Sequence, residues 1–304
     1  MSALGQSAIS FFKTKTVRWT LFGLVALIFG AGVVLYAGSA WRLARTYDVA
    51  PIVLNAPASS AENGDRLATL IGCKACHNAN GGVLFNVPIV GRLVTPNLSR
   101  ITEEYSDAEL ARVIRAGVKR DGTSAIAMPT ESFAWLADDD LADIIAWMRS
   151  LKRVPDNEPS QTTWGPVGRL MILQGTAPFS AEEGKGATPP AAHPTAPPVA
   201  VGDYLTHVAC RDCHRLDVEH RVKPGTIAPP LRAVAQGYDL AQFTHLMRTG
   251  QGIGDREVGM MSEVAKSSFM HFSDAEIAAM HAYLNAGEET AAAGDASARA
   301  AAAQ

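Results

Sequence analysis

The longest apolar stretch of the chain lies close to its N-terminus. No charged residue occurs between Trp19 and Trp41, whereas the segment before it, residues 1–18, is short and basic. A helix over residues 19–41 is long enough to cross about 30 Å of hydrocarbon. Aromatic residues lie near both of its ends, where such side chains anchor at membrane interfaces. The pattern therefore predicts one transmembrane helix, preceded by a cytoplasmic N-terminus over residues 1–18.

A cleaved secretory signal is the alternative interpretation of this stretch. Gly38, Ser39 and Ala40 would serve as a small-residue cleavage site. The apolar region of such signals usually covers only ~7–15 residues. The longer run in this chain favours a retained anchor.

Further along, apolar residues recur at helical spacing in two regions, residues 61–155 and 201–288. In the first region, Ser106 and Glu109 form a capping box before a helix that Gly117 ends. A later helix carries apolar side chains on one face: Leu141, Ile144, Ile145, Met148 and Leu151. No alternating strand pattern of comparable length is present in the sequence. We therefore predict an all-α chain.

Segments of different composition separate these regions. Residues 46–60 have the composition of a tether, and residues 167–173 have the apolar content of a short helix. Prolines make residues 181–200 a semi-stiff linker: Pro189, Pro190, Pro194, Pro197 and Pro198. Residues 289–304 are almost all small and offer no apolar face, which indicates a mobile tail.

Length and charge narrow the function only slightly. The 304 residues allow two domains at the usual ~100–200 residues each. The formal net charge is −3 and the sequence has no long basic run, so no nucleic-acid partner is indicated.

All four cysteines fall in two copies of one motif, C-x-x-C-H. The first copy contains Cys73, Cys76 and His77, and the second contains Cys210, Cys213 and His214. This motif is the attachment signature of c-type haem. Two thiols one helical turn apart can each bond a vinyl group of the porphyrin, and the imidazole that follows can turn onto the iron. The sequence therefore predicts two covalently attached haem c groups.

Zinc and redox-active thiols are the alternative interpretations of these cysteines. A zinc site would need a second pair of Cys or His residues at ligand spacing nearby. A thioredoxin-like motif would lie in a βαβ pattern. The sequence has neither feature, so haem is favoured.

The second region is a copy of the first, and the repeat indicates the sixth iron ligand. Several positions coincide: Pro96 with Pro229, Leu98 with Leu231, Tyr105 with Tyr238, Arg115 with Arg248, and Gly117 with Gly250. The same alignment brings Met128, which precedes the last helix, onto Met261. A lone methionine is more often core packing. Methionine opposite histidine is the cytochrome c pattern of haem ligation, however, and the repeat favours Met128 and Met261 in that role.

The second haem keeps several alternatives for its sixth ligand. Met260 is adjacent to Met261, and Met270, His271 and His245 are further candidates. The repeat selects Met261 among them.

Pro96 and Pro229 have two possible roles. Their carbonyl oxygens could accept a hydrogen bond from the ring N–H of His77 and His214 and so fix each imidazole. Stiffening of the loop would explain the same prolines equally well.

Both regions resemble class I cytochrome c over nearly all of residues 61–288. More narrowly, four segments are similar to the cytochrome subunits of membrane-bound alcohol and gluconate dehydrogenases: Thr95-Pro96-Asn97-Leu98, Tyr105-Ser106-Asp107-Ala108-Glu109-Leu110, Arg115-Ala116-Gly117-Val118 and Met128-Pro129. The resemblance implies two tandem class I cytochrome c domains after one N-terminal transmembrane helix. It also implies thioether links at the four cysteines, proximal His77 and His214, and distal Met128 with Met261. That family usually carries three haem motifs, and this chain has two.

The resemblance further implies an electron-transfer protein rather than an enzyme. Subunits of this kind pass electrons from a catalytic partner towards ubiquinone or a terminal oxidase. Because c-type haem is attached outside the cytoplasmic membrane, we expect a single-pass protein of the bacterial inner membrane with its haem domains in the periplasm. The expected partners are redox proteins, namely a dehydrogenase, a quinol-oxidising complex or an oxidase, with no small-molecule substrate.

Two other functions are compatible with the motifs. A dihaem cytochrome c peroxidase would need one haem with an accessible sixth position and an acid–base group beside it, such as His271 or Glu263. A fixed cytochrome subunit of a terminal oxidase would be distinguished by stable copurification with that oxidase.

Overall fold

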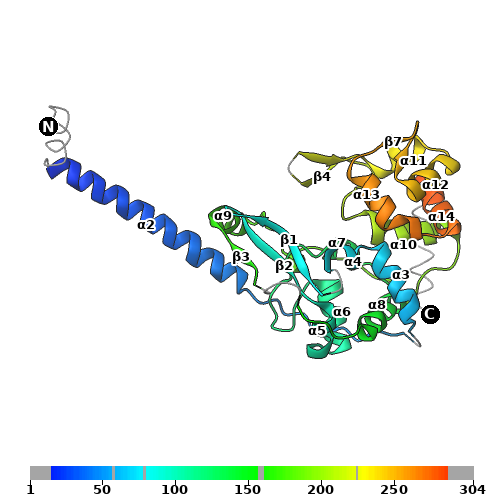
Figure 1. The fold of residues 1–304 in the computed structure, drawn as a ribbon, viewed down its shortest axis with the longest axis horizontal. Helices are drawn as coiled ribbons and strands as arrows, with labels where there is room; N and C mark the ends of the chain where they lie inside the picture. The colour runs from blue at the N-terminus through cyan, green and yellow to red at the C-terminus, as the bar shows by residue number, and fades with distance from the viewer. Residues whose placement is uncertain (1–14, 57–58, 78–79, 157–160, 224, 287–304) are drawn as a thin grey trace. The chain divides into compact units, whose positions relative to one another are not determined.

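The computed structural model describes residues 15–56, 59–77, 80–156, 161–223 and 225–286 (Figure 1). The chain divides into two compact units. The first comprises Met1–Arg45, Asn86–Arg92 and Thr162–Ala177, and the second comprises Thr46–Phe85, Leu93–Gln161 and Pro178–Gln304. Most of the predicted cytoplasmic N-terminus, and the predicted tail over residues 289–304, lie outside the described residues.

The first unit is built on one long helix, α2 (Lys15–Leu43), which contains the predicted transmembrane segment. Its apolar side chains are exposed along that segment, as they are in a helix surrounded by lipid. A short helix, α9 (Pro166–Gln174), packs against α2 and is preceded by the strand β3 (Thr163–Trp164). Proline in the first turn begins α9 and Gly175, at φ 74°, ends it. The expected short helix is therefore present.

In the second unit, the first helical region forms α3 (Ala61–Leu70), α4 (Cys73–His77), α5 (Leu98–Glu104), α6 (Asp107–Ala116), α7 (Thr130–Phe133) and α8 (Asp138–Ser150). The predicted capping box is present at the start of α6, where Ser106 and Glu109 each bond the backbone N–H of the other. Gly117 ends α6 in the left-handed conformation, at φ 67°. The apolar face of α8 is buried in the core.

The second helical region forms α10 (Pro198–Cys210), α11 (Leu231–Gln236), α12 (Leu240–Thr249), α13 (Met260–Ser267), the 3-10 turn η2 (Phe269–His271) and α14 (Asp274–Asn285). Capping boxes begin α12 and α14. Gly250 ends α12 at φ 73°, as Gly117 ends α6. The two copies thus use the same local signals to begin and end corresponding helices.

In each copy, the first helix crosses the last helix at close range. A Cβ atom on Gly64 of α3 would lie 1.9 Å from the Asp143 carbonyl oxygen of α8. In the second copy, a Cβ on Gly202 of α10 would lie 2.0 Å from the Ala279 carbonyl oxygen of α14. Backbones approach this closely only where no side chain intervenes. Because each haem motif begins at or just after α3 or α10, these crossings fix where the motifs lie.

Three small sheets accompany the helices within the described residues. They contain β1 (Gly82–Val87) and β2 (Gly91–Thr95) with β3, then β4 (His220–Lys223) with β5 (Thr226–Ala228), and β6 (Gln251–Gly252) with β7 (Arg256–Glu257). The predicted all-α class therefore describes the main part of the fold and omits these strands. Most side chains of β1 are exposed on both faces. A strand of this kind has no alternating apolar pattern by which the sequence could reveal it.

Hydrogen bonds join the two helical regions within the second unit. The Tyr204 hydroxyl of α10 donates to Asp140 Oδ2 at 2.6 Å and accepts from the Ala137 N–H at 3.1 Å. In the proline-rich segment before α10, the His193 N–H donates to the Asp139 carboxylate at 2.9 Å. The segment between the two copies is therefore bound to the start of α8.

Candidate haem sites

Each C-x-x-C-H motif forms a tight turn at the end of the first helix of its copy. α4 begins at Cys73 and ends at His77, after Gly72, at φ 82°, redirects the chain from α3. In the second copy Cys210 is the last residue of α10, and the His214 N–H donates to its carbonyl oxygen at 3.0 Å. The turn keeps the two thiols and the imidazole close in space, which suits two thioether bonds and one axial ligand.

The two motif histidines make the same backbone contact. His77 Nδ1 lies 3.0 Å from the Pro96 carbonyl oxygen, and His214 Nδ1 lies 2.8 Å from the Pro229 carbonyl oxygen. Because a carbonyl oxygen only accepts, Nδ1 donates in both rings, and Nε2 is the nitrogen that can bind a metal. Burial lowers the pKa of both histidines, which favours the neutral ring that metal binding requires. Of the two roles considered for Pro96 and Pro229, the structure contains the contacts that the first requires.

No disulfide bond joins any of the four cysteines. Burial raises the pKa of Cys73 and Cys210 to about 12, and that of Cys213 to about 11. A neutral thiol suits thioether formation, in which the S–H adds across a vinyl group of the porphyrin. The described residues contain no group of three or more His, Cys, Asp or Glu side chains that could hold a metal ion. The geometry gives no support to the zinc interpretation.

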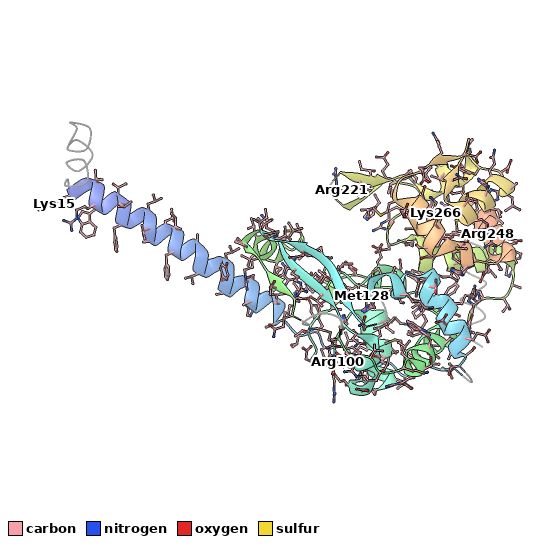
Figure 2. All side chains as sticks on the ribbon, viewed as in Figure 1. Lys15, Arg100, Met128, Arg221, Arg248 and Lys266 are labelled. Atoms are coloured by element: carbon pink, nitrogen blue, oxygen red, sulfur yellow. The ribbon has the colours of Figure 1, made fainter. Side chains whose placement is uncertain are left out.

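Met128, labelled in Figure 2, lies in the first copy just before α7, and its backbone is tightly constrained. Ala127, before it, has φ 59°, a left-handed conformation that is uncommon for a residue with a side chain. The Met128 N–H donates at 3.0 Å to the hydroxyl of Ser180, the first residue of the 3-10 turn η1 (Ser180–Glu182). The Met128 side chain is half-buried against the core, and α7 begins at Thr130. The backbone on both sides therefore fixes the position from which this side chain projects.

The second copy presents two adjacent methionines in the first turn of α13. Met261 is half-buried and packs against the core, whereas the Met260 side chain is 38% exposed. Packing therefore distinguishes the two and favours Met261.

Two backbone features align these methionines with the first copy in different ways. Gln251 of β6 pairs with Glu257 of β7, as Val118 pairs with Ser124 in the first copy. When these two pairs are aligned, Met261 corresponds to Met128. The residue with positive φ gives a different alignment. Ala127 directly precedes Met128, whereas Gly259, at φ 65°, directly precedes Met260. Strand register agrees with the packing of Met261, and the position of the bend favours Met260.

The remaining candidates for the sixth ligand have exposed side chains. His245 Nε2 lies 3.3 Å from Asp255 Oδ1, in an ion pair when the ring is protonated. Met270 is 47% exposed, and His271 beside it is exposed as well. None of these three side chains packs into the core of the second copy.

The paired motifs, the histidine–proline contacts and the repeated helices match one known family. The family model described as cytochrome c matches residues 61–152 and 199–288. The chain belongs to the cytochrome c family. Membership implies covalently bound haem c, and the two matched regions each contain one attachment motif.

Curated relatives of this cytochrome are subunits of dehydrogenases. It is 24% identical over 291 residues to a fructose dehydrogenase cytochrome subunit from Gluconobacter japonicus, covering 83% of this chain and 57% of the relative. It is 30% identical over 200 residues to an alcohol dehydrogenase (quinone) cytochrome c subunit from Komagataeibacter europaeus, covering 59% and 39%. It is 27% identical over 263 residues to a gluconate 2-dehydrogenase cytochrome c subunit from Pantoea cypripedii, covering 73% and 58%. The matched part is less than two thirds of each relative's length.

The cytochrome also contains a charged contact that the sequence analysis missed. Arg215 Nη2 lies 2.8 Å from Glu131 Oε2, and Arg211 Nη2 lies 3.8 Å from Glu131 Oε1. Arg211 lies within the second haem motif and Arg215 directly follows it, whereas Glu131 belongs to α7 of the first copy. The pKa of Glu183 is raised to about 7, mainly by burial and to a smaller extent by the negative charges of Asp212 and Glu131. Residues this far apart in sequence form no recognisable motif, so no local signal could have predicted the contact.

Proposed function

We propose that this cytochrome is a membrane-anchored dihaem electron carrier of the periplasm. It would pass electrons between a dehydrogenase or quinol-oxidising complex and a terminal oxidase. The observation that carries the proposal is the repeated histidine contact, in which the Pro96 and Pro229 carbonyls orient His77 and His214 alike. Two equivalent sites of this kind are what electron transfer through two haems requires.

The residues of both sites fit haem c. Cys73, Cys76, Cys210 and Cys213 would form the thioether links, His77 and His214 would bind iron through Nε2, and Met128 and Met261 would bind it from the opposite side. The haem iron supplies one-electron redox chemistry, and methionine opposite histidine raises its potential. The proline carbonyls hold the imidazole planes, and Ser180 holds the backbone of Met128. Two protein ligands to each iron would leave no position for a substrate, so we propose an electron-transfer protein rather than an enzyme.

The peroxidase alternative has less support. It requires an acid–base group beside an accessible iron. Glu263 and His271, the candidates for that group, both have exposed side chains. No specific contact of either residue favours this function.

The membrane anchor is supported by the way in which α2 continues through the possible cleavage site. α2 is helical across residues 38–40. Ser39 is fully buried and accepts a hydrogen bond from Arg169 Nη1 at 2.9 Å, and Gly38 is packed against Leu173. Cleavage there would remove a segment that the folded unit uses for packing, so we propose that α2 is retained.

The partner is proposed from the relatives. Their names place such subunits with fructose, alcohol and gluconate dehydrogenases. We propose a membrane dehydrogenase as the electron donor of this cytochrome.

Ligand substitution with carbon monoxide as probe tests the proposal. The purified protein should show two low-spin haems by EPR, a weak absorption band from methionine–iron ligation, and no carbon monoxide binding when reduced. Met128→Ala and Met261→Ala should each open one iron, giving carbon monoxide binding to one haem of two and a lower potential for that haem. Met270→Ala, at an exposed position, is the matched control and should change nothing.

Two results would contradict parts of this assignment. Carbon monoxide binding by the unaltered reduced protein would reveal an open iron and favour the peroxidase alternative. If Met261→Ala leaves both irons closed while Met260→Ala opens one, the second ligand is Met260, as the backbone bend suggests.

A further inference from the structure

Exposed apolar side chains gather in the first unit, outside the long helix. Val87 and Ile89 lie at the tip of the β1–β2 hairpin, and Val167 and Leu170 lie on α9. Ile89 is 63% exposed, although it is a large aliphatic side chain. Contiguous exposed apolar side chains mark a surface that meets another apolar phase. We call residues 86–92 and 162–177 the interfacial lobe.

The interfacial lobe is held together by backbone hydrogen bonds. The Val167 N–H donates to the Ile89 carbonyl oxygen at 2.9 Å, and the Gly165 N–H donates to the Val90 carbonyl oxygen at 2.9 Å. A Cβ on Gly168 would lie 2.0 Å from the same Val90 oxygen, so α9 and the hairpin tip are in close backbone contact. The hairpin tip and α9 therefore move as one piece.

The lobe is fastened to one end of α2, beside which α9 lies in Figure 1. Arg169 Nη1 donates to Ser39 Oγ at 2.9 Å, and the Arg169 guanidinium lies 4.4 Å from the centre of the Tyr36 ring. Arg42 Nη1 donates to the Leu173 carbonyl oxygen at 3.5 Å. All of these contacts lie in the last turns of α2.

This point of attachment sets the depth of the lobe in a membrane. A helix needs about 20 residues to cross the hydrocarbon layer. Counted from Trp19, the far boundary of that layer falls near Gly38 and Ser39, where α9 packs. The lobe therefore lies at the level where acyl chains meet lipid headgroups, and its exposed apolar side chains can enter that layer.

The charge of the first unit suits the same location. None of the 30 Asp and Glu residues of the chain falls within residues 1–45, 86–92 or 162–177. The charged residues of the lobe itself are Arg92 and Arg169. A surface with cations and no carboxylates is attracted to anionic phospholipid headgroups.

We propose that the interfacial lobe inserts its apolar side chains into the headgroup–acyl boundary of the membrane that α2 crosses. The inference rests on the proposed anchor. α2 and the lobe would then give the cytochrome two adjoining attachments to one bilayer surface, which restricts rotation about the helix axis and tilting of its periplasmic end.

Spin-label depth measurement on the full chain tests this inference. Nitroxides are placed at Ile89→Cys and Val167→Cys, with Val33→Cys in α2 as the hydrocarbon reference and Val53→Cys, at 86% exposed, as the aqueous reference. With the native cysteines in thioether bonds, only the introduced thiol reacts. The protein is reconstituted in phosphatidylethanolamine–phosphatidylglycerol vesicles with both haems oxidised. The power saturation of each label under nitrogen is subtracted, so that relaxation by haem iron cancels. Accessibility to oxygen and to a water-soluble nickel chelate is then compared.

The labels at positions 89 and 167 should both show depth parameters between those at positions 33 and 53. If both labels are as accessible to nickel as the label at position 53 while that at position 33 remains in lipid, the lobe lies in water and the inference is overturned, and a protein partner becomes the candidate occupant. If the label at position 33 is itself in water, the anchor is wrong and the inference falls with it.

Discussion

Substitution of Gly64 by alanine tests the helix crossing on which the first haem domain is built. The added Cβ would lie 1.9 Å from the Asp143 carbonyl oxygen and 2.9 Å from the Trp147 Cβ. Ordinary contacts between such atoms lie at ~3.5 Å, so α3 and α8 must separate by about 1.5 Å. The obstacle is backbone, which cannot rotate away as a flexible side chain could.

The expected cost follows from two opposing effects. Overpacking of a close-packed contact destabilises by ~1–3 kcal/mol, and the rigid carbonyl places this site at the upper end. Alanine recovers ~1 kcal/mol through its better helix propensity. The net loss should be about 2 kcal/mol, a substantial part of the ~5–15 kcal/mol that stabilises a typical domain.

Urea unfolding of the reduced and oxidised protein, followed by circular dichroism in the haem region, measures this loss. Gly202→Ala should destabilise the second domain similarly, because its Cβ would lie 2.0 Å from the Ala279 carbonyl oxygen. Gly30→Ala is the matched control, since nothing lies within 4 Å of a Cβ there. If Gly64→Ala unfolds at the same urea concentration as the unaltered chain, the helices are not in the close contact described.

Two further predictions concern the bonds around the start of α8. Tyr204→Phe leaves the buried Asp140 carboxylate and the Ala137 N–H without the Tyr204 hydroxyl and should cost ~1–3 kcal/mol in thermal unfolding; an unchanged Tm would refute this. Burial lowers the pKa of His193, but Asp140 and then Asp139 outweigh it and hold that pKa above its usual value. The protonated ring therefore stabilises the fold below pH ~6.5, and this stability is lost as pH rises through the raised folded pKa. Urea unfolding from pH 6 to 9 should show that loss, and His193→Gln should remove it; equal losses in both proteins would contradict the assignment.

Much of the helical fold could be predicted because its signals are local. The capping box of Ser106 and Glu109 and the glycine at position 117 each act within a few residues, and the structure contains both as expected. The repeat likewise placed Pro96 and Pro229 equivalently, and the contacts with His77 and His214 agree with one of the two roles considered for these prolines. Periodicity and repetition were sufficient for these features.

The features that could not be predicted depend on contacts between distant segments. Most side chains of β1 are exposed on both faces, and the hairpin tip packs on α9, so the sequence of β1 carries no alternation. The pairing of Glu131 with Arg215 joins residues 84 positions apart and resembles any other surface charges in sequence. The choice between Met260 and Met261 depends on a one-residue displacement of a left-handed bend. Glycine at position 259 permits that bend, but its presence in the sequence does not predict it.

The order in which the chain enters and leaves its two units bears on how a soluble form could be produced. The chain passes between them after residues 45, 85, 92, 161 and 177, so the unit that contains α2 is interleaved with the one that contains the haem motifs. Removal of residues 1–45 alone would delete α2 and leave α9 and the hairpin tip behind, with Leu173 stripped of its packing against Gly38. Such a shortened protein would keep the exposed apolar side chains of the hairpin tip and α9, and would newly expose the part of Leu173 that Gly38 covers. A water-soluble version needs coordinated redesign of all three segments, because no single cut separates the unit of α2 from the two cytochrome c domains.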